Sequence, residues 1–247
     1  MTLRKSRLDL LLVERGLAET RTQAQALILA GDVFIGEQLA KKPGSLVPRD
    51  APLRLRQKLR YVSRGGLKLE RALRELAISV EGKICADIGA STGGFTDCLL
   101  QAGACKVYAI DVGRGQLHAR LAEDPRVVRR DGVNARYLSE ADLPELVDAA
   151  TVDVSFISLT QVLPAVVRRL RPGGTLIALV KPQFEVGRSK VAKGGVVKDP
   201  VAREEAIRKI AGFLEGEGLR VLGRLDSPIA GPAGNVEALI AAVQSGL

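Results

Sequence analysis

The sequence is poor in the residues that carry redox, metal and disulfide chemistry. It has no Trp, aromatic residues make up only 3% of its 247 positions, and His118 is the only histidine. A single histidine excludes His-rich metal sites and leaves any Ser-His-Asp mechanism to that one residue. The three cysteines, Cys85, Cys98 and Cys105, form no C-x-x-C pair, so their odd count predicts reduced thiols and no metal site.

Long apolar segments are also lacking. No uncharged run reaches the roughly 18 residues needed to span a membrane. The longest charge-free stretch, 154–167, is broken by Ser, Thr, Gln and Pro. The first residues, Met-Thr-Leu-Arg-Lys, lead directly into charged side chains without the apolar core of a signal peptide. We therefore expect a cytoplasmic protein with no membrane partner.

The charge is unevenly distributed along the chain. The net charge is +9; residues 1–60 hold 12 basic against 6 acidic side chains, and the remaining residues hold 25 against 22. An evenly basic protein could simply be soluble, whereas a short basic block favours a polyanionic partner such as nucleic acid.

Residues 1–60 have the pattern of a small α+β unit. Leucines at helical spacing from Leu8 predict a helix that stops at Gly16, and Thr20 is placed to cap a second helix that stops at Gly31. Short β-like pieces at 33–35 and 53–55 follow, separated by prolines and glycines. We expect this unit to be one domain, joined by a hinge at 61–65 to a second domain over 66–247.

From Gly66 onward, apolar strands alternate with amphipathic helices. The expected strands are 84–88, 107–110, 127–129, 151–154, 176–180, 222–225 and 237–243. The expected helices are 67–76, 94–101, 159–170 and 200–217. Alternation of this kind predicts an α/β fold with a Rossmann-like, doubly wound sheet.

Charged or glycine-rich positions directly follow several of these strands, where ligands bind in open α/β sheets. A loop that begins with Asp87 contains Gly89, Ser91 and Gly93, and Asp111 follows the next strand, where an acid can bind ribose hydroxyls. The spacing differs from the G-x-G-x-x-G dinucleotide fingerprint and is more typical of S-adenosylmethionine methyltransferases. A tight turn without a ligand is the alternative.

Five segments, in order along the chain, carry a more specific resemblance. They are YVSRGGLKLE (61–70), DIGASTGGFT (87–96), DVSFISL (153–159), KPQFE (181–185) and GPAGNVE (231–237). The sequence resembles the TlyA family, historically called hemolysin A, which joins an N-terminal S4 RNA-binding domain to an FtsJ-type methyltransferase domain. Family members usually have Ser at position 20 and an aromatic residue after the final Glu, where this chain has Thr20 and Ala238.

The resemblance implies two sets of site residues. A catalytic Lys-Asp-Lys-Glu tetrad maps by motif onto Lys68, Asp153, Lys181 and Glu237. Positions that would bind S-adenosylmethionine are Asp87, Gly89, Ser91, Gly93 and Asp111, with Asp131 on the adenine side. Charged residues at strand ends could alternatively be solvated caps.

The implied reaction is methyl transfer to a ribose 2′-hydroxyl of rRNA, with cytidine as the implied target. This hydroxyl is a poor nucleophile, so it needs proton removal and in-line placement. We expect Lys181 to deprotonate or orient it, Asp153 to orient Lys181, and Glu237 to position Lys68 or the ribose. Shorter family members act on large-subunit RNA and longer ones on both subunits, so the short C-terminal end favours large-subunit RNA.

The N-terminal unit is expected to contact RNA phosphates. The candidate residues are Arg4, Lys5, Arg7, Arg21, Lys41 and Lys42. A basic solubilising domain is the alternative. Elsewhere, Phe95, Phe156 and Phe184 could stack on a base, or simply pack in the core.

Two other functions stay open at this level. A non-catalytic ribosome-assembly factor would be expected to lack a tetrad residue, and all four are present. A membrane-lysing toxin, as the historical name suggests, would need an apolar or amphipathic insertion segment and an export signal, and the sequence has neither.

Overall fold

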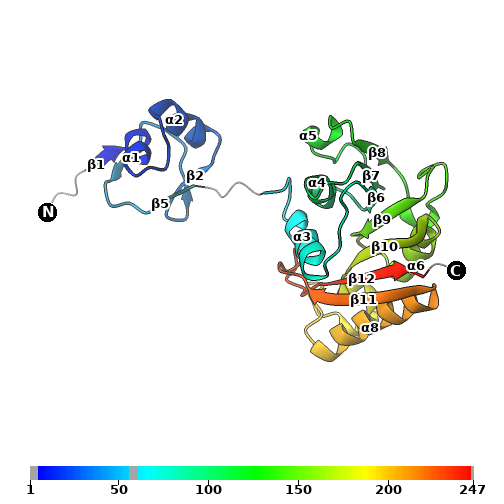
Figure 1. Cartoon of the computed structure of the whole chain (residues 1–247). Helices are drawn as coiled ribbons and strands as arrows, with labels where there is room; N and C mark the ends of the chain where they lie inside the picture. Colours follow the sequence, from blue (N-terminus) through cyan, green and yellow to red (C-terminus); the bar gives the residue numbers. More distant parts are fainter. Residues whose placement is uncertain (1–4, 56–59, 246–247) are drawn as a thin grey trace. The chain divides into compact units, whose positions relative to one another are not determined.

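The computed structural model describes residues 5–55 and 60–245, and the chain divides into two compact units, residues 1–59 (unit 1) and 60–247 (unit 2) (Figure 1). Each unit has its own hydrophobic core. In the described part of the chain, no helix is long and apolar enough to cross a membrane.

Unit 1 packs two helices against short strands. The elements are β1 (Lys5–Arg7), α1 (Leu8–Glu14), α2 (Arg21–Leu29), β2 (Val33–Ile35), β3 (Gln38–Leu39), β4 (Leu46–Pro48) and β5 (Leu53–Leu55). Thr20 caps α2, since its hydroxyl accepts a hydrogen bond from the backbone N–H of Gln23 at 3.2 Å. Leu8, Leu11 and Leu12 of α1 are buried in the core of the unit. β1 pairs with β4, and β2 lies between β3 and β5.

Unit 2 is built on a seven-stranded sheet with the order β11-β12-β10-β9-β6-β7-β8. The strands are β6 (Ile84–Ile88), β7 (Lys106–Asp111), β8 (Val127–Asp131), β9 (Val147–Val152), β10 (Leu170–Val180), β11 (Leu219–Asp226) and β12 (Ala238–Gln244). β10, β9, β6, β7 and β8 pair in parallel, and β12 runs antiparallel to β10 and β11. The strand order reverses beside β6, which creates the crevice where ligands bind in such sheets.

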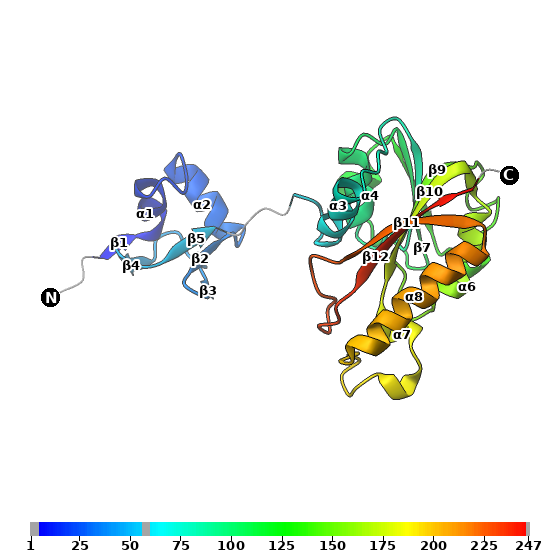
Figure 2. The ribbon, with the colours of Figure 1, turned by 60° about the horizontal axis from the view of Figure 1, so that its bottom comes forward.

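Helices cover both faces of this sheet. They are α3 (Gly65–Glu75), α4 (Gly94–Gln101), α5 (Ala119–Ala122), α6 (Leu159–Val167), α7 (Pro182–Glu185) and α8 (Pro200–Gly216), with 3₁₀ turns at η1 (Ala135–Tyr137) and η2 (Arg188–Lys190). Figure 2 shows α3 and α4 on one face and α6 and α8 on the other. Alternate strand residues serve the two layers: Cys85 packs with Leu99 of α4, whereas Ile88 packs with Leu163 of α6. The expected Rossmann-like, doubly wound α/β fold is confirmed.

Several expected bounds are wrong: β10 begins at Leu170 and not at 176, and β11 spans Leu219–Asp226 and not 222–225. Tertiary pairing explains two further differences. The strand expected at 151–154 is β9, which begins at Val147 and ends at Val152, so Asp153 opens the following loop. The helix expected to reach residue 170 ends at Val167, because Leu170 is already paired with Val147 in the parallel ladder.

Candidate active site

The loop between β6 and α4 depends on glycine at two points. Gly89 has φ +86°, and a Cβ there would lie 2.5 Å from the carbonyl oxygen of Asp153. Gly93 has φ +95° and caps α4, and a Cβ there would collide with Leu117 and Leu121. Only glycine fits either position without strain, so the loop can pass close under the end of β9.

Asp87 supports this loop from inside the fold. Its side chain is fully buried, and its oxygens accept hydrogen bonds from the hydroxyls of Thr96 at 2.7 Å and Thr151 at 3.0 Å. Burial raises the pKa of Asp87 to about 6, although both threonine hydrogen bonds oppose the shift. The structure thus places Asp87 between β6, α4 and β9, where it acts on the shape of the loop.

A pocket of about 500 Å³ opens in front of the loop. Gly89 and Ser91 form one wall together with Asp111 at the end of β7. Asp111 accepts hydrogen bonds from the backbone N–H groups of Ser91 at 2.8 Å and Gly113 at 2.7 Å. Each carboxylate oxygen retains a lone pair, so Asp111 can still accept from a ligand hydroxyl.

The far side of the pocket differs from the expectation for Asp131. Asp131 is the last residue of β8 and accepts a hydrogen bond from the N–H of Gly115 at 2.8 Å. Its Oδ2 also lies 3.4 Å from Nε of Arg129. The wall is formed instead by Val133, Asn134 and Ala135. Asn134 is a polar wall residue that sequence reasoning missed. It directly precedes the turn η1 and caps it.

The loop also has the G-x-S-x-G spacing of hydrolase nucleophiles, with Ser91 at φ +49°. Such a serine needs a histidine base. His118 caps α5: it is exposed, and its Nδ1 accepts a hydrogen bond from the N–H of Arg120 at 3.2 Å. In a triad, Nδ1 donates a hydrogen bond to a carboxylate, whereas here Nδ1 accepts one from the backbone. His118 is therefore not arranged as a triad base, and Ser91 serves as a wall residue of the pocket.

A second, smaller pocket of about 240 Å³ adjoins the first. Both pockets share Gly89, Ser91 and Asp153 as wall residues. The second continues past Lys68 and is closed by two segments, 63–65 and 229–232. Two ligands held in these pockets would therefore meet beside Asp153.

The four tetrad positions form two ion pairs, and one member of each pair lines a pocket: Asp153 lines both pockets, and Lys68 lines the second. Lys181 Nζ lies 2.6 Å from Asp153 Oδ1 and also donates a hydrogen bond to the hydroxyl of Ser155 at 2.7 Å. Lys68 Nζ lies 2.6 Å from Glu237 Oε2, and the Glu237 side chain is only 1% exposed. Each buried or half-buried ammonium thus faces one carboxylate, which offsets the cost of removing the charges from water.

The antiparallel strand β12 explains how Glu237 reaches the site. Val180, the last residue of β10, pairs with Ala238, the first residue of β12. Lys181 and Glu237 are the next residues outward, so both lie at the carboxyl edge of the parallel strands. A parallel β12 would have placed Glu237 at the opposite edge.

A second link joins the two loops that carry Asp153 and Lys181. Glu185 is buried and accepts hydrogen bonds from the hydroxyl of Ser158 at 2.6 Å, the N–H of Leu159 at 2.7 Å and Lys209 Nζ at 3.1 Å. Ser158 lies five positions after Asp153, and Glu185 lies four positions after Lys181. Sequence reasoning missed Glu185, Ser158 and Lys209, and the KPQFE motif was the one signal for Glu185.

An aromatic pair also connects these two segments of the chain. The rings of Phe156 and Phe184 are 5.3 Å apart at their centroids. Phe156 lines the larger pocket, is 92% exposed and has φ +65°, an unfavourable conformation for a residue with a Cβ. Phe95 is buried in the core and also lines the smaller pocket.

The basic residues expected to contact RNA lie in unit 1. Lys5, Lys41 and Lys42 are exposed. Arg7 and Arg21 both form ion pairs with the buried carboxylate of Asp9. Arg4 lies outside the described residues. Within residues 5–55 and 60–245, no group of three or more His, Cys, Asp and Glu side chains could hold a metal ion.

Comparison with known families assigns this site to a class. Residues 61–244 match the FtsJ-like methyltransferase family, and residues 6–51 match the S4 domain. Sheet, loop and tetrad together therefore define an FtsJ-like methyltransferase that carries an S4 domain. Within this class, the chain belongs to the TlyA, or hemolysin A, family.

Individual relatives cover nearly the whole chain. YqxC of Bacillus subtilis is 51% identical over 242 residues, 97% of this chain and 86% of the relative. The 16S/23S rRNA (cytidine-2′-O)-methyltransferase TlyA of Mycobacterium tuberculosis is 46% identical over 236 residues, 95% of this chain and 88% of the relative. A solved structure described as a hemolysin of Streptococcus thermophilus is 44% identical, with a TM-score of 0.75 over 99% of this chain and 90% of that one.

Proposed function

We propose that this protein transfers the methyl group of S-adenosylmethionine to the 2′-hydroxyl of a cytidine in rRNA. The observation that carries the proposal is the pair of Lys–carboxylate contacts, one through Asp153, which lines both pockets, and one through Lys68, which lines the smaller pocket. The relative in Mycobacterium tuberculosis, whose name gives this reaction, supports the choice of cytidine and rRNA. Such a substrate would place the protein in the cytoplasm, with ribosomes.

The larger pocket fits S-adenosylmethionine in size and chemistry. Its volume suits a nucleoside-sized ligand, Asp111 can accept hydrogen bonds from ribose hydroxyls, and Val133, Ala135 and Val162 offer apolar contacts for the adenine. Asp111, Gly89 and Ser91 would hold the ligand, with Asp87 and Gly93 shaping the loop. The bound cofactor supplies an electrophilic methyl group on a sulfonium.

The acceptor ribose would occupy the smaller pocket, between Lys68 and Asp153. Methyl transfer forms one C–O bond, breaks one C–S bond and releases the proton of the hydroxyl. Lys181, held by Asp153 and Ser155, would orient the hydroxyl oxygen, and after giving up one of its own protons to solvent its neutral amine would receive the hydroxyl proton. Glu237 would fix Lys68 against the ribose, because this buried carboxylate leaves Lys68 little freedom.

The test replaces Lys181 with Met, which keeps the length of the side chain but removes the ammonium. We expect Lys181→Met to reduce methyl transfer at least about 100-fold, in the range of a lost general base, with cofactor affinity nearly unchanged. The measurement is incorporation of radiolabelled methyl into 30S and 50S subunits that lack the modification, beside calorimetric titration with S-adenosylmethionine.

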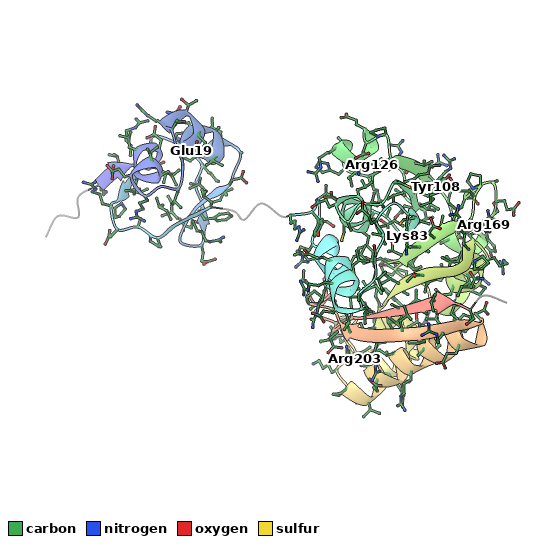
Figure 3. The ribbon with its side chains drawn as sticks, viewed as in Figure 1. Glu19, Lys83, Tyr108, Arg126, Arg169 and Arg203 are labelled. Carbon is green, nitrogen blue, oxygen red and sulfur yellow. The ribbon has the colours of Figure 1, made fainter. Side chains whose placement is uncertain are left out.

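A matched control is Lys83→Met. Lys83 directly precedes β6, at the end of the strand opposite the site (Figure 3). Normal turnover in Lys181→Met would overturn its assigned role. Cofactor binding without methyl transfer to either subunit by the unmodified protein would instead favour the non-catalytic assembly factor.

A further inference from the structure

A buried acid of unit 1 forms ion pairs with two of its basic side chains. The carboxylate of Asp9, in α1, is fully buried. It accepts five hydrogen bonds: two from the guanidinium of Arg7 at 3.0 and 2.9 Å, and one each from Arg21 Nε, Gln25 Nε2 and the N–H of Leu10, all at 3.0 Å. A carboxylate with this many donors remains ionised, and the hydrogen bonds from Arg7 hold the pKa of Asp9 well below its usual range.

Asp9 brings two cations side by side. Arg7 Nη2 and Arg21 Nε reach the same oxygen, Oδ2 of Asp9. The other side of Arg7 is bounded by Gly44, where a Cβ would lie 3.2 Å from Nη1 and 3.3 Å from Nη2. The Arg7 guanidinium is therefore fixed between a carboxylate and a stretch of backbone.

Both arginines can still bind a ligand. Their side chains are 41% and 53% exposed, and neither uses more than two of its nitrogens on Asp9. A guanidinium has five N–H donors in a planar fork that matches a phosphate. With one carboxylate against two guanidiniums, the cluster keeps a net positive charge.

We propose that Asp9 is a positioning residue that sets Arg7 and Arg21 as a binding site for one backbone phosphate of RNA, here called the Asp9 fork. The inference rests on the proposed function, in which unit 1 binds rRNA. Long arginine side chains lose conformational freedom when they grip a ligand, and Asp9 imposes that order before the RNA arrives.

The proposal and simple electrostatics predict effects of opposite sign for Asp9→Asn. Removing an acid from a basic surface should strengthen binding to a polyanion. If Asp9 positions the arginines, its loss should instead weaken RNA binding, by about tenfold, as expected when one charge-assisted hydrogen bond is removed. The salt dependence of RNA binding should become shallower in the variant, because one phosphate contact fewer is made.

The experiment measures the dissociation constant of the full chain for in vitro transcribed 23S and 16S rRNA at two salt concentrations. The matched control is Glu37→Gln, which makes the same charge change in unit 1 on a side chain that is 97% exposed. We expect Glu37→Gln to bind RNA as tightly as the unmodified protein or more tightly. Binding by Asp9→Asn that is equal to or tighter than the control would overturn the proposal.

A second variant keeps the proposal testable if Asp9→Asn destabilises unit 1. Arg21→Lys keeps the charge but loses the Nε hydrogen bond to Asp9, and we expect a similar loss of affinity. In the double variant the two losses should not add, since both act on one phosphate site. Fully additive losses, or an Arg21→Lys protein with normal affinity, would contradict the Asp9 fork.

The proposed catalytic function is read out separately. At saturating rRNA, methyl transfer by Glu37→Gln should equal that of the unmodified protein, because Glu37 lies outside both the tetrad and the Asp9 fork. RNA binding with no methyl transfer by any of these proteins would remove the proposed reaction and leave the Asp9 fork standing. No rRNA binding by the unmodified protein would overturn both.

Discussion

Asp87 is a carboxyl group whose protonation the fold itself controls. Burial raises its pKa from the ordinary 3.8 to about 6, so between these pH values the folded protein binds more protons than the unfolded chain. Stability from this group is therefore present below pH 4 and is lost as the pH rises through 6. Near neutral pH the ionised carboxylate is held in the fold at a cost, offset in part by Thr96 and Thr151.

We predict that Asp87→Asn changes this pH dependence. Asn stays neutral and can keep a hydrogen bond to a threonine hydroxyl. The unfolding free energy of the variant minus that of the unmodified protein should rise by up to about 3 kcal/mol from pH 4 to pH 7.5. This is the free energy of a pKa shift of roughly two units. Urea unfolding of both proteins across this range is the measurement. A difference that stays constant with pH would mean that the carboxylate is not buried in this way.

The burial of Glu185 could not be predicted from the sequence. The sequence shows an acidic residue after Phe184, but the local pattern does not indicate whether its carboxylate faces water or, as in the structure, three hydrogen-bond donors. The same is true of Asp9, which lies in the first turn of an amphipathic helix. Buried acids are invisible to sequence periodicity because their partners, such as Lys209 or Arg21, come from other elements.

At the level of elements, the two loops that carry Asp153 and Lys181 are cross-linked twice. The Lys181–Asp153 pair forms the first link, and Glu185 with Ser158 and the N–H of Leu159 forms the second. α7 has only four residues and cannot hold its position by helical hydrogen bonds alone. We therefore expect Glu185 to fix the distance between the loops.

Loss of this second link should affect turnover more than cofactor binding. We predict that Glu185→Ala lowers kcat about tenfold or more, leaves the affinity for S-adenosylmethionine within about twofold, and lowers stability by about 1–3 kcal/mol through an unsatisfied buried N–H. Glu185→Gln should recover part of kcat, because its amide can still pair with Ser158 and Leu159. The measurements are methyl-transfer kinetics and thermal unfolding.

Lys209→Met is the control for the charge of this cluster. It removes the cation but keeps the two hydrogen bonds that Glu185 accepts from the Ser158 hydroxyl and the Leu159 N–H. If Lys209→Met impaired kcat as much as Glu185→Ala, the loop link would not be the cause. A Glu185→Ala protein with unchanged kcat would also exclude the positioning role.

Elements with strong periodicity were predictable, and so were the short strands at 33–35 and 53–55, whereas the other short strands of unit 1 were not. The strand 84–88 and the helix 94–101 are found with the expected bounds, because apolar alternation and the Gly-rich N-terminus define them. β1, β3 and β4 have two or three residues, too few to show a period, and β1 forms only by pairing with the distant β4. The motif positions predicted the tetrad, whereas its pairing depends on the direction of β12.

On the scale of the whole molecule, the charge and the chemistry belong to different units. Unit 1 contains the basic block and the Asp9 fork, and unit 2 contains both pockets and the tetrad. Each unit has its own core, so the loss of one should leave the other folded.

We predict that removal of residues 1–59 lowers rRNA affinity and makes it less sensitive to salt, while S-adenosylmethionine affinity is retained. Each phosphate that unit 1 no longer neutralises should reduce the slope of log affinity against log salt by about 0.9 for duplex regions. The cut preserves Arg60, which forms an ion pair with Glu70 of α3. Filter binding at several salt concentrations and calorimetry are the measurements. Unchanged RNA affinity would leave unit 1 without its proposed role.

The ion pair between Lys68 and Glu237 joins residues 169 positions apart. Such a pair closes a very long loop, so it forms only when nearly all of unit 2 has been synthesised and has folded. Lys68 therefore has no carboxylate partner until β12 is in place. A chain whose other strands have already paired would still lack one of the two ion pairs of the site, so this pair forms only in the complete fold of unit 2.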